Sequence, residues 1–395
     1  MEIIFWISLF IVFYAFFGYG ILLFLLVKIK SWFYFYPLPD FGESAPEVSL
    51  VVPCFNEADI IREKILNSFG LAYDPSLLKI FFITDGSDDH FKEVLNEFPN
   101  VGHLHEAKRS GKTAAENRAM QFISSPIVIF TDANTLLNHL AIKNIVRHFQ
   151  DEKVGCVSGE KRVQIEEKDN ASAAGEGIYW KYESFLKQLD SSLYSAVGAA
   201  GELVAFRSDL YENLPDDTIL DDFMQSMLIA SKGYKIVYEP QAFAMESGSE
   251  TVPEELKRKI RISAGGWQSM KRLWNKITPL NHPVLFFQYF SHRVLRWTIT
   301  PFLLILVFIL NPFLWAYGWV YQILMISQIL FYLAALLGYF LENRQIRLKI
   351  LFVPFYFCMM NYAVIAGLIR FLKGGQKGSW EKARRKGERA MRSKE

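Results

Sequence analysis

Long apolar segments without charged residues lie near both ends of this 395-residue chain. Residues 3–27 carry no charge and are long enough to cross a hydrocarbon core of roughly 30 Å. Residues 297–341 are uncharged and offer room for two further spans, and residues 350–369 form another uncharged run. We therefore expect a membrane protein with an N-terminal transmembrane anchor at 1–30, transmembrane segments at 298–371 and one soluble domain at 45–275.

Between these segments the pattern changes to short apolar runs, each followed by a polar turn and an amphipathic stretch. Val48–Val52 is such a run, and apolar residues then recur at helical spacing over residues 60–70. The same order repeats with a strand at Lys79–Ile83 and a helix after it, and a third apolar strand begins at Ile127. Strand–turn–helix units in series predict a Rossmann-like α/β domain with a mostly parallel sheet.

Polar side chains follow each of the three predicted strands, as Asn56-Glu57, Asp85-Gly86-Ser87 and Asp132-Ala133-Asn134. Ligands of parallel sheets bind outside the carboxyl ends of the strands, so we expect these residues to meet at one edge. Each motif alone is also compatible with an ordinary turn or helix cap, and Lys112 with a solvated lysine at a helix start. The chain contains neither GxxxxGK[ST] nor GxGxxG, the phosphate-binding loops of P-loop and dinucleotide-binding proteins.

Charge and cysteine usage suggest where this domain lies. A formal net charge of +2 gives no reason to expect nucleic-acid binding. The three cysteines are far apart and form no metal-ligand pattern, so we expect structural thiols in a reducing compartment. Lys28, Lys30 and the basic tail at 373–395 favour the cytoplasmic side for the soluble domain.

The number of membrane spans is left open by the sequence. The first segment lacks a basic start and a cleavage site, so we expect an uncleaved anchor in the inner or plasma membrane. If domain and tail are both cytoplasmic, an even number of spans must follow the domain, whereas three apolar segments do. Either one of them is re-entrant or interfacial, with Pro354 as a break, or the tail lies outside. Residues 282–297 interleave aromatic residues with His292, Arg293 and Arg296, which predicts an amphipathic helix at the membrane interface.

Seven stretches of the soluble domain occur in an order typical of one family. They are VSLVVPCFNEADII, FFITDGSDD, KRSGKTAAENRAM, IVIFTDANTLL, GELVAFR, LDDFMQSMLIASKGYKIVYEP and RKIRISAGGWQ. The chain resembles the membrane-embedded family-2 glycosyltransferases, which include poly-N-acetylglucosamine, cellulose, chitin and hyaluronan synthases and smaller non-processive relatives. The resemblance covers residues 45–275. It implies a GT-A fold flanked by transmembrane helices and an inverting sugar transfer from a nucleotide sugar, in the first place a UDP-sugar.

The resemblance also implies roles for the residues at the strand ends. Glu57 and Asp85 match positions that hold the base and ribose of the nucleotide, and Lys112 matches a lysine near the nucleotide. Asp132 and Asn134 match the DxD pair. The first residue of that pair contacts the ribose or the metal, and the second ligates a divalent cation, Mg²⁺ or Mn²⁺, between the phosphates.

Two further matches concern the reaction itself. Asp222, in Leu220-Asp221-Asp222, matches the general base of the Thr-Glu-Asp motif, and Arg261 matches the QxxRW arginine that contacts the diphosphate. The chemistry requires both, because an acceptor hydroxyl must lose its proton as it attacks and the leaving nucleoside diphosphate gathers negative charge. Ionised Asp221 beside Asp222 would raise the pKa of that base. Without the resemblance, Asp222 reads as an acid favoured at a helix N-terminus by the macrodipole.

The chain departs from the family pattern in two motifs. Asn134 stands where the family has an aspartate, and its amide oxygen adds no charge, which predicts weaker metal binding. Arg258 and Ile262 replace the Gln and Trp of QxxRW, and in polymer synthases that Trp helps to seat the acceptor sugar. Trp267 is a candidate substitute for this platform, or a core aromatic residue. Gly201 is a candidate for a substrate-binding acceptor loop, or for a plain turn.

We therefore expect an inverting hexosyltransferase in cell-surface polysaccharide or glycolipid synthesis, acting on a lipid-linked or glycan acceptor at the membrane. Two alternatives stay open: a processive polysaccharide synthase, and a catalytically weak nucleotide-sugar-binding subunit of a polysaccharide export complex. Retention of Asp222, Lys112 and Arg261 favours an enzyme, whereas Asn134 favours the binding subunit. Export or synthase subunits are candidate protein partners.

Overall fold

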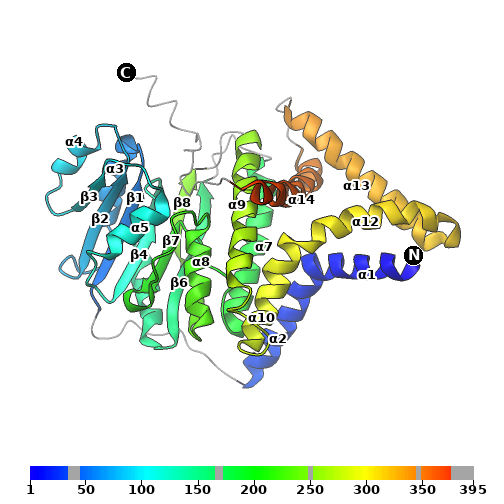
Figure 1. Cartoon of the computed structure of the whole chain (residues 1–395), viewed down its shortest axis with the longest axis horizontal. Helices are drawn as coiled ribbons and strands as arrows, with labels where there is room; N and C mark the ends of the chain where they lie inside the picture. Colours follow the sequence, from blue (N-terminus) through cyan, green and yellow to red (C-terminus); the bar gives the residue numbers. More distant parts are fainter. Residues whose placement is uncertain (34–44, 165–171, 248–251, 344–347, 375–395) are drawn as a thin grey trace.

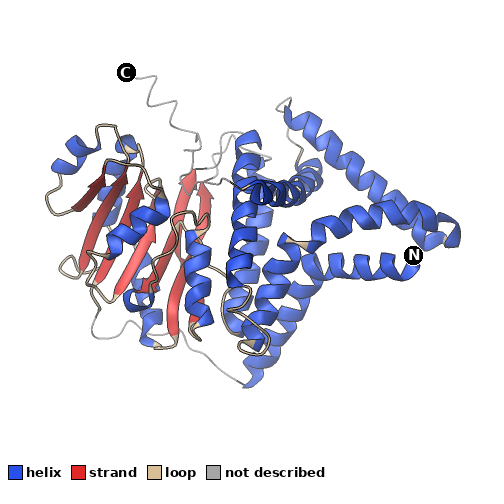
Figure 2. Cartoon of the chain, viewed as in Figure 1, coloured by secondary structure: helices blue, strands red, loops and turns tan. Residues whose placement is uncertain are grey.

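The computed structural model describes residues 1–33, 45–164, 172–247, 252–343 and 348–374. An α/β domain built on one sheet stands beside long helices that extend away from it, with the N-terminus among those helices (Figure 1). Figure 2 shows the same division between the sheet and the helical part. Nearly all of the predicted basic tail at 373–395 lies outside the described residues.

Within the described residues, eight strands form one sheet in the order β3-β2-β1-β4-β7-β6-β8-β5. The strands are β1 (Val48–Cys54), β2 (Leu78–Asp85), β3 (Gly102–Glu106), β4 (Ile127–Thr131), β5 (Thr135–Leu137), β6 (Val154–Gln164), β7 (Leu203–Arg207) and β8 (Lys235–Ser247). β1 pairs in parallel with β2 and β4, and β2 with β3. β7 is antiparallel to both neighbours, β6 and β8 are parallel, and β5 is antiparallel to β8. The expected α/β sheet is therefore present, with a parallel half and a mixed half.

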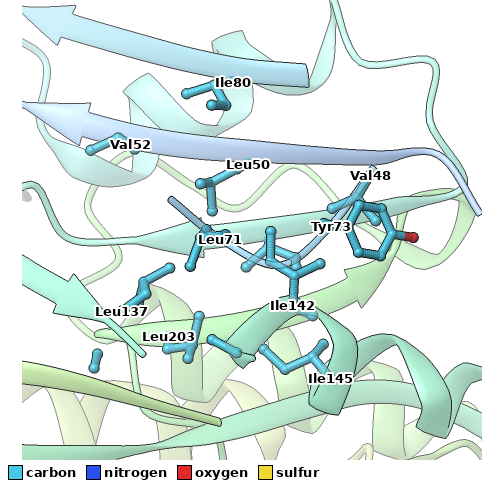
Figure 3. Packing of buried hydrophobic residues seen from close by; sticks show 14 of the residues in the cluster. Val48, Leu50, Val52, Leu71, Tyr73, Ile80, Leu137, Ile142, Ile145 and Leu203 are labelled. Carbon is cyan, nitrogen blue, oxygen red and sulfur yellow. The ribbon is translucent and has the colours of Figure 1, made fainter. Parts of the chain in front are cut away.

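Helices cover both faces of the sheet because successive strand residues point into two separate cores. In β1, Leu50 and Val52 pack into one apolar cluster and Val51 into the other. Figure 3 shows part of the first cluster, where Leu50 and Val52 lie near Leu71. Its helices are α3 (Ala58–Phe69), α4 (Phe91–Asn96) and α6 (Ala141–Val146); those of the second include α5 (Lys112–Met120) and α8 (Asp221–Ser231).

Four helices in the described part of the chain are long and apolar enough to cross a membrane: Glu2–Phe33, Ile299–Tyr317, Trp319–Glu342 and Ile350–Lys373. They comprise α1 (Glu2–Phe13), a π-turn and α2 (Tyr19–Phe33), then α12 (Ile299–Leu314), α13 (Trp319–Asn343) and α14 (Lys349–Lys373). They coincide with the apolar segments of the sequence, which agrees with membrane association.

Helix α14 packs against α9 (Val252–Leu273), the long helix beside the sheet (Figure 1). The two helices approach closely at Gly367, where an added Cβ would lie 2.5 Å from the Cβ of Ser263. A larger residue at this position would force the helices apart. The last apolar helix is therefore held against the helix that carries Arg261.

A buried polar network joins α2 to the globular domain through α7 (Ser172–Leu193). The Asp190 carboxylate of α7 accepts hydrogen bonds from the Tyr19 hydroxyl of α2 and from Gln288 Nε2 (3.0 Å). Its second oxygen lies 2.5 Å from His292 Nδ1. All four side chains are at most 1% exposed. One carboxylate thus holds together three segments that are far apart in the sequence.

The predicted interfacial helix at 282–297 forms α10 (Pro283–Tyr289), a π-turn and α11 (Leu295–Trp297). Its arginines face α7, because Glu183 lies 3.1 Å from Arg293 and 2.6 Å from Arg296. These basic side chains therefore have a buried partner in the domain. The location of this helix at a membrane surface stays a prediction.

Replacing Asp190 with alanine should destabilise the protein by about 3–5 kcal/mol, because His292 and two further hydrogen-bond donors would stay buried without their acceptor. Thermal unfolding of the purified protein in detergent measures this loss. Arg62→Ala is the control, since it removes a pair with Glu97 whose side chains are each about half exposed, and its loss of stability should be much smaller than that of Asp190→Ala. Equal losses in the two variants would show that the buried network adds nothing.

Candidate active site at the strand ends

The loops after β1 and β2 are tied to each other at the carboxyl edge of the sheet. Asn56 has a left-handed backbone with φ of 52°. Its Nδ2 donates to the Asp88 carboxylate (2.7 Å), and its Oδ1 accepts from the Asp88 backbone N–H (3.0 Å). Asp89 accepts from the backbone N–H of Ala58 (2.8 Å) at the start of α3. Glu57, partly buried at the cap position of α3, lies on the rim that these bonds form.

Asp85 ends β2 and anchors the loop that precedes α5. Its carboxylate is 4% exposed and accepts hydrogen bonds from the backbone N–H groups of Ser110 (2.8 Å) and Gly111 (2.7 Å). The Arg118 guanidinium lies 3.5 Å from the other oxygen. Asp85 therefore holds the chain that leads into Lys112, and a direct contact with a nucleotide stays a prediction.

A hollow opens between the end of β1 and this loop. It is lined by Pro53, Cys54, Phe55, Asp85, Arg109, Gly111, Lys112 and Ala115. The Arg109 guanidinium lies 3.5 Å from the centre of the Phe55 ring, a cation–π contact that places two flat groups at the wall. Such a hollow suits a flat, polar ligand.

Lys112 stands at the centre of the candidate site, in the first turn of α5. Its Nζ lies 2.7 Å from Asp132, 3.8 Å from Asp221 and 3.9 Å from Glu116. Burial disfavours the charged ammonium, but these three carboxyl groups outweigh it and raise the pKa of Lys112 well above its usual range. The lysine is therefore a permanent cation beside the turn after β4.

Glu116 is a member of this cluster that the sequence analysis did not single out. Burial raises its pKa well above the ordinary value, the charge of Asp221 adds to the effect, and the two side chains share a hydrogen bond. Glu116 therefore favours its protonated form more than an ordinary glutamate does. The sequence feature that could have identified Glu116 is its position four residues after Lys112, which places both side chains on the same face of α5.

Asp222 lies in the first turn of α8, where its Oδ1 accepts a hydrogen bond from the backbone N–H of Phe223 (2.7 Å). The loop before β7 passes so close that a Cβ added to Gly201 would lie 3.0 Å from Asp222 Oδ2 and 3.4 Å from Lys112 Nζ. Burial, and then Asp221, raise the pKa of Asp222 to about 7, against the opposing charge of Lys112. This carboxyl group is set to exchange a proton near neutral pH.

Helix α9 carries both Arg261 and Trp267. The charges of Asp221 and Asp132 act on the partly buried Arg261 guanidinium, although burial and then Arg258 lower its pKa. Trp267 packs against the second apolar cluster, and its indole N–H has no hydrogen-bond partner among the described residues. The described apolar contacts of Trp267 are thus with this cluster, and its role as a sugar platform stays a prediction.

The sequence-predicted site residues therefore fall into three groups. One group converges on one point: Lys112, Asp132, Asp222 and Gly201, with Arg261 close enough to act by charge. Glu57 and Asp85 lie on the neighbouring rim. Trp267, partly buried, packs against the second apolar cluster.

The donor set for a metal is small. Among the described residues, no three His, Cys, Asp or Glu side chains converge as metal ligands. Asp132, which already pairs with Lys112, and partly buried Asn134 offer two oxygen ligands. This fits a hard cation such as Mg²⁺, which usually takes its remaining ligands from water and substrate phosphates.

Comparison with known proteins points to glycosyl transfer. Residues 45–265 match the family model described as glycosyltransferase-like family 2, which confirms the resemblance found in the sequence. Poly-beta-1,6-N-acetyl-D-glucosamine synthase of Staphylococcus aureus (strain MSSA476) is 27% identical over 248 residues, 59% of this chain and 58% of that protein. Probable glycosyltransferase YdaM of Bacillus subtilis (strain 168) is 23% identical over 249 residues, 56% of this chain and 55% of that protein. The alignments thus span less than two thirds of these relatives.

One solved structure supports the fold over most of the chain. It is the mannosyltransferase PcManGT from Pyrobaculum calidifontis in complex with GDP-Man and Mn²⁺. The two folds agree with a TM-score of 0.70 at 22% sequence identity, over 93% of this chain and 99% of that chain. The predicted GT-A fold, flanked by helices apolar enough to span a membrane, is confirmed.

The raised pKa of Asp222 predicts how stability depends on pH. An ordinary aspartate in the unfolded chain titrates near 3.8, whereas the folded value is about 7. Between these values the folded state holds a proton that the unfolded state releases, so stability falls as pH rises through this window and levels off above it. Asp222→Asn should therefore stabilise the protein more at pH 8 than at pH 5, by about 1 kcal/mol or more.

Thermal unfolding of wild type and variant at both pH values tests this. Asp216→Asn, an exposed residue in the loop before α8, is the matched control and should show no such difference. An equal gain for Asp222→Asn at pH 5 and pH 8 would contradict a raised pKa.

Proposed function

Because this chain belongs to the glycosyltransferase-like family 2, we propose that it moves a sugar from a nucleoside diphosphate sugar to an acceptor hydroxyl, with inversion at the anomeric carbon. The observation that carries this proposal is the convergence of Lys112, Asp132 and Asp222. Lys112 Nζ lies 2.7 Å from Asp132, and a Cβ on Gly201 would contact both Asp222 and Lys112. A proton acceptor thus stands beside a cation suited to phosphate.

The residues divide the proposed reaction between them. Asp222 accepts the proton of the acceptor hydroxyl as its oxygen attacks the anomeric carbon. The bond between that carbon and the phosphate oxygen breaks, and its electron pair leaves with the nucleoside diphosphate. Lys112 and Arg261 offer positive charge to this leaving group. Attack from the face opposite the leaving group inverts the anomeric centre.

Asp132 and Asn134 are the residues that would hold a divalent cation, Mg²⁺ or Mn²⁺. When bound, the cation supplies further positive charge for the diphosphate. We place uracil first among the nucleotide bases, and the GDP-Man bound to the structurally similar mannosyltransferase makes guanine the second choice. The observed site carries no feature that selects one sugar.

We also propose that the domain faces the cytoplasm and that α14 lies along the membrane surface. Of the four apolar helices, α14 is the most buried against the rest of the chain, and Gly367 fixes it against α9. The two helices α12 and α13 would then be the spans that follow the domain. This even number leaves the domain and the basic end of the chain on one side, as the positive charges favour.

The acceptor is proposed to be lipid-linked and to receive one or a few sugars. Ile262 stands where polymer synthases have an aromatic platform, and Trp267 packs against the second apolar cluster. Loss of such a platform forfeits about 1 kcal/mol of stacking, which favours release of the product between turnovers. The similar S. aureus protein is named as a synthase of a polymer, so the experiment below also tests the processive alternative.

The experiment is a panel of radiolabelled nucleotide sugars, incubated with purified protein and membrane lipids in detergent with and without Mn²⁺. We expect sugar transfer to lipid from one donor, in products too short to form a ladder on a sizing gel. Asp222→Asn is the matched variant. It should bind the nucleoside diphosphate as wild type does and lose transfer by roughly 100-fold or more.

Activity of Asp222→Asn within tenfold of wild type would contradict the assignment of the base. A high-molecular-weight ladder from the isolated protein would favour the processive synthase. Binding of a nucleotide without transfer or hydrolysis of any donor would favour the binding subunit instead of the enzyme.

Asn134→Asp should lower the metal concentration needed for half-maximal activity several-fold, because it replaces a neutral amide oxygen by a charged ligand. Titration of activity with Mn²⁺ measures the change. Asn100→Asp, which adds the same charge at an exposed turn, is the control. Activity that EDTA leaves unchanged, or an identical metal response in Asn134→Asp and wild type, would contradict this metal site.

A further inference from the structure

Lys64 is a lysine on the apolar face of α3 with no exposed surface. It lies between Ile61 and Ile65, which pack into the first core. Its Nζ reaches the turn after β4 and lies 3.0 Å from Thr131 Oγ1, 2.7 Å from the Thr135 carbonyl oxygen and 3.3 Å from Thr135 Oγ1. Three N–H donors thus meet three acceptors, all from the two residues that flank Asp132-Ala133-Asn134.

The two threonine hydroxyls connect Lys64 to the candidate site by hydrogen bonds. Thr135 Oγ1 donates to the backbone carbonyl of Asp132 (2.9 Å), and Thr131 Oγ1 donates to the backbone carbonyl of Glu202 (2.9 Å). Each hydroxyl can donate in this way while it accepts from Lys64. The network therefore joins α3 to the turn that carries Asp132 and to the loop that carries Gly201.

The ammonium of Lys64 is held by neutral oxygens. Within the described residues, no carboxylate forms an ion pair with it. Burial lowers the pKa of Lys64 to about 7, and Asp132 is the strongest influence in the opposite direction. Burying an amine of this kind costs free energy that an apolar residue of similar size would not, so its presence calls for a role beyond filling the core.

Lys64 could instead serve to hold strand β5 in place. This is a weaker explanation for the buried lysine, since another residue of α3 already holds that strand. The Asn67 side chain donates to the backbone carbonyl of Leu137 (2.9 Å) and accepts from its N–H (2.8 Å). Asn67 pins the far end of β5, whereas Lys64 binds the near end, next to Asp132. Asn67 thus supports the strand, and Lys64 supports the turn.

We propose that Lys64 is a positioning residue, which holds the turn Thr131–Thr135 so that Asp132 and Asn134 face the diphosphate of the donor. This inference rests on the proposed function for the nature of the ligand. Lys64 approaches the turn from the core, and Lys112 pairs with Asp132 from the other helix. Asp132 is therefore held between two lysines, one acting through the backbone and one directly.

The test measures binding of UDP and of GDP to the full-length protein in detergent, with and without Mn²⁺. Lys64→Met keeps the apolar length of the side chain and removes the donors. We expect it to weaken nucleotide binding by about tenfold or more, because a displaced turn misplaces Asp132. Thr135→Val, which removes one acceptor and the bond to Asp132, should weaken binding by about threefold. Asn67→Ala is the matched control and should change binding by less than about twofold.

A kinetic readout separates positioning from general damage to the fold. Lys64→Met should raise the KM for the donor and leave the KM for the acceptor unchanged, while Asn67→Ala should lose thermal stability without either change. Lys64→Gln, which keeps two N–H donors, should recover part of the binding. If Lys64→Met does not fold, Thr135→Val and Lys64→Gln carry the test.

Nucleotide binding in Lys64→Met and Thr135→Val equal to wild type would overturn the inference. So would an equal loss of binding in Asn67→Ala, since the loss would then come from the fold. A wild-type protein that binds no nucleoside diphosphate and transfers no sugar contradicts the proposed function itself, which distinguishes the two failures.

Discussion

The charge of Lys112 is the interaction on which the arrangement at the strand ends depends. Asp132, Asp221 and Glu116 come from three separate elements and lie 2.7, 3.8 and 3.9 Å from its Nζ. Without a cation, three partly buried carboxyl groups would repel one another. Burial first, and then the charge of Asp221, raise the pKa of Glu116 well above its ordinary value and that of Asp222 to about 7. Burial and neighbouring negative charge together thus prepare a proton acceptor near neutral pH.

The two halves of the sheet explain why these groups can meet. The parallel half ends β1, β2 and β4 at one edge, where Asp85 fixes the loop that leads into Lys112. The antiparallel strand β7 begins where β4 ends, since Leu203 pairs with Thr131. This pairing brings Gly201 beside the turn that carries Asp132. Helix α9, packed against α14, carries Arg261, on which the charges of Asp221 and Asp132 act.

Much of this could be predicted from local pattern, because strand periodicity and turn chemistry are written in neighbouring residues. The parallel strands, the polar strand ends and the family were predicted and are confirmed. The partners of Asp85 could not be, since Ser110 and Gly111 reach it only through tertiary folding. Lys64 lies on an apolar helical face and meets Thr131 and Thr135, so periodicity alone gave no reason to single it out. Trp267 was singled out, but the sequence could not distinguish a sugar platform from an aromatic residue that packs against the core.

The central claim is that a nucleoside diphosphate binds where Lys112 and Asp132 meet, beside Asp222. A structure of the protein with bound nucleoside diphosphate and Mn²⁺, determined by electron cryomicroscopy, tests it most directly. The account predicts density for the diphosphate against the Asp132 turn and Lys112, with the base in the hollow walled by Phe55 and Arg109. Nucleotide bound at another surface, or at this edge but shielded from Asp222, would contradict the account.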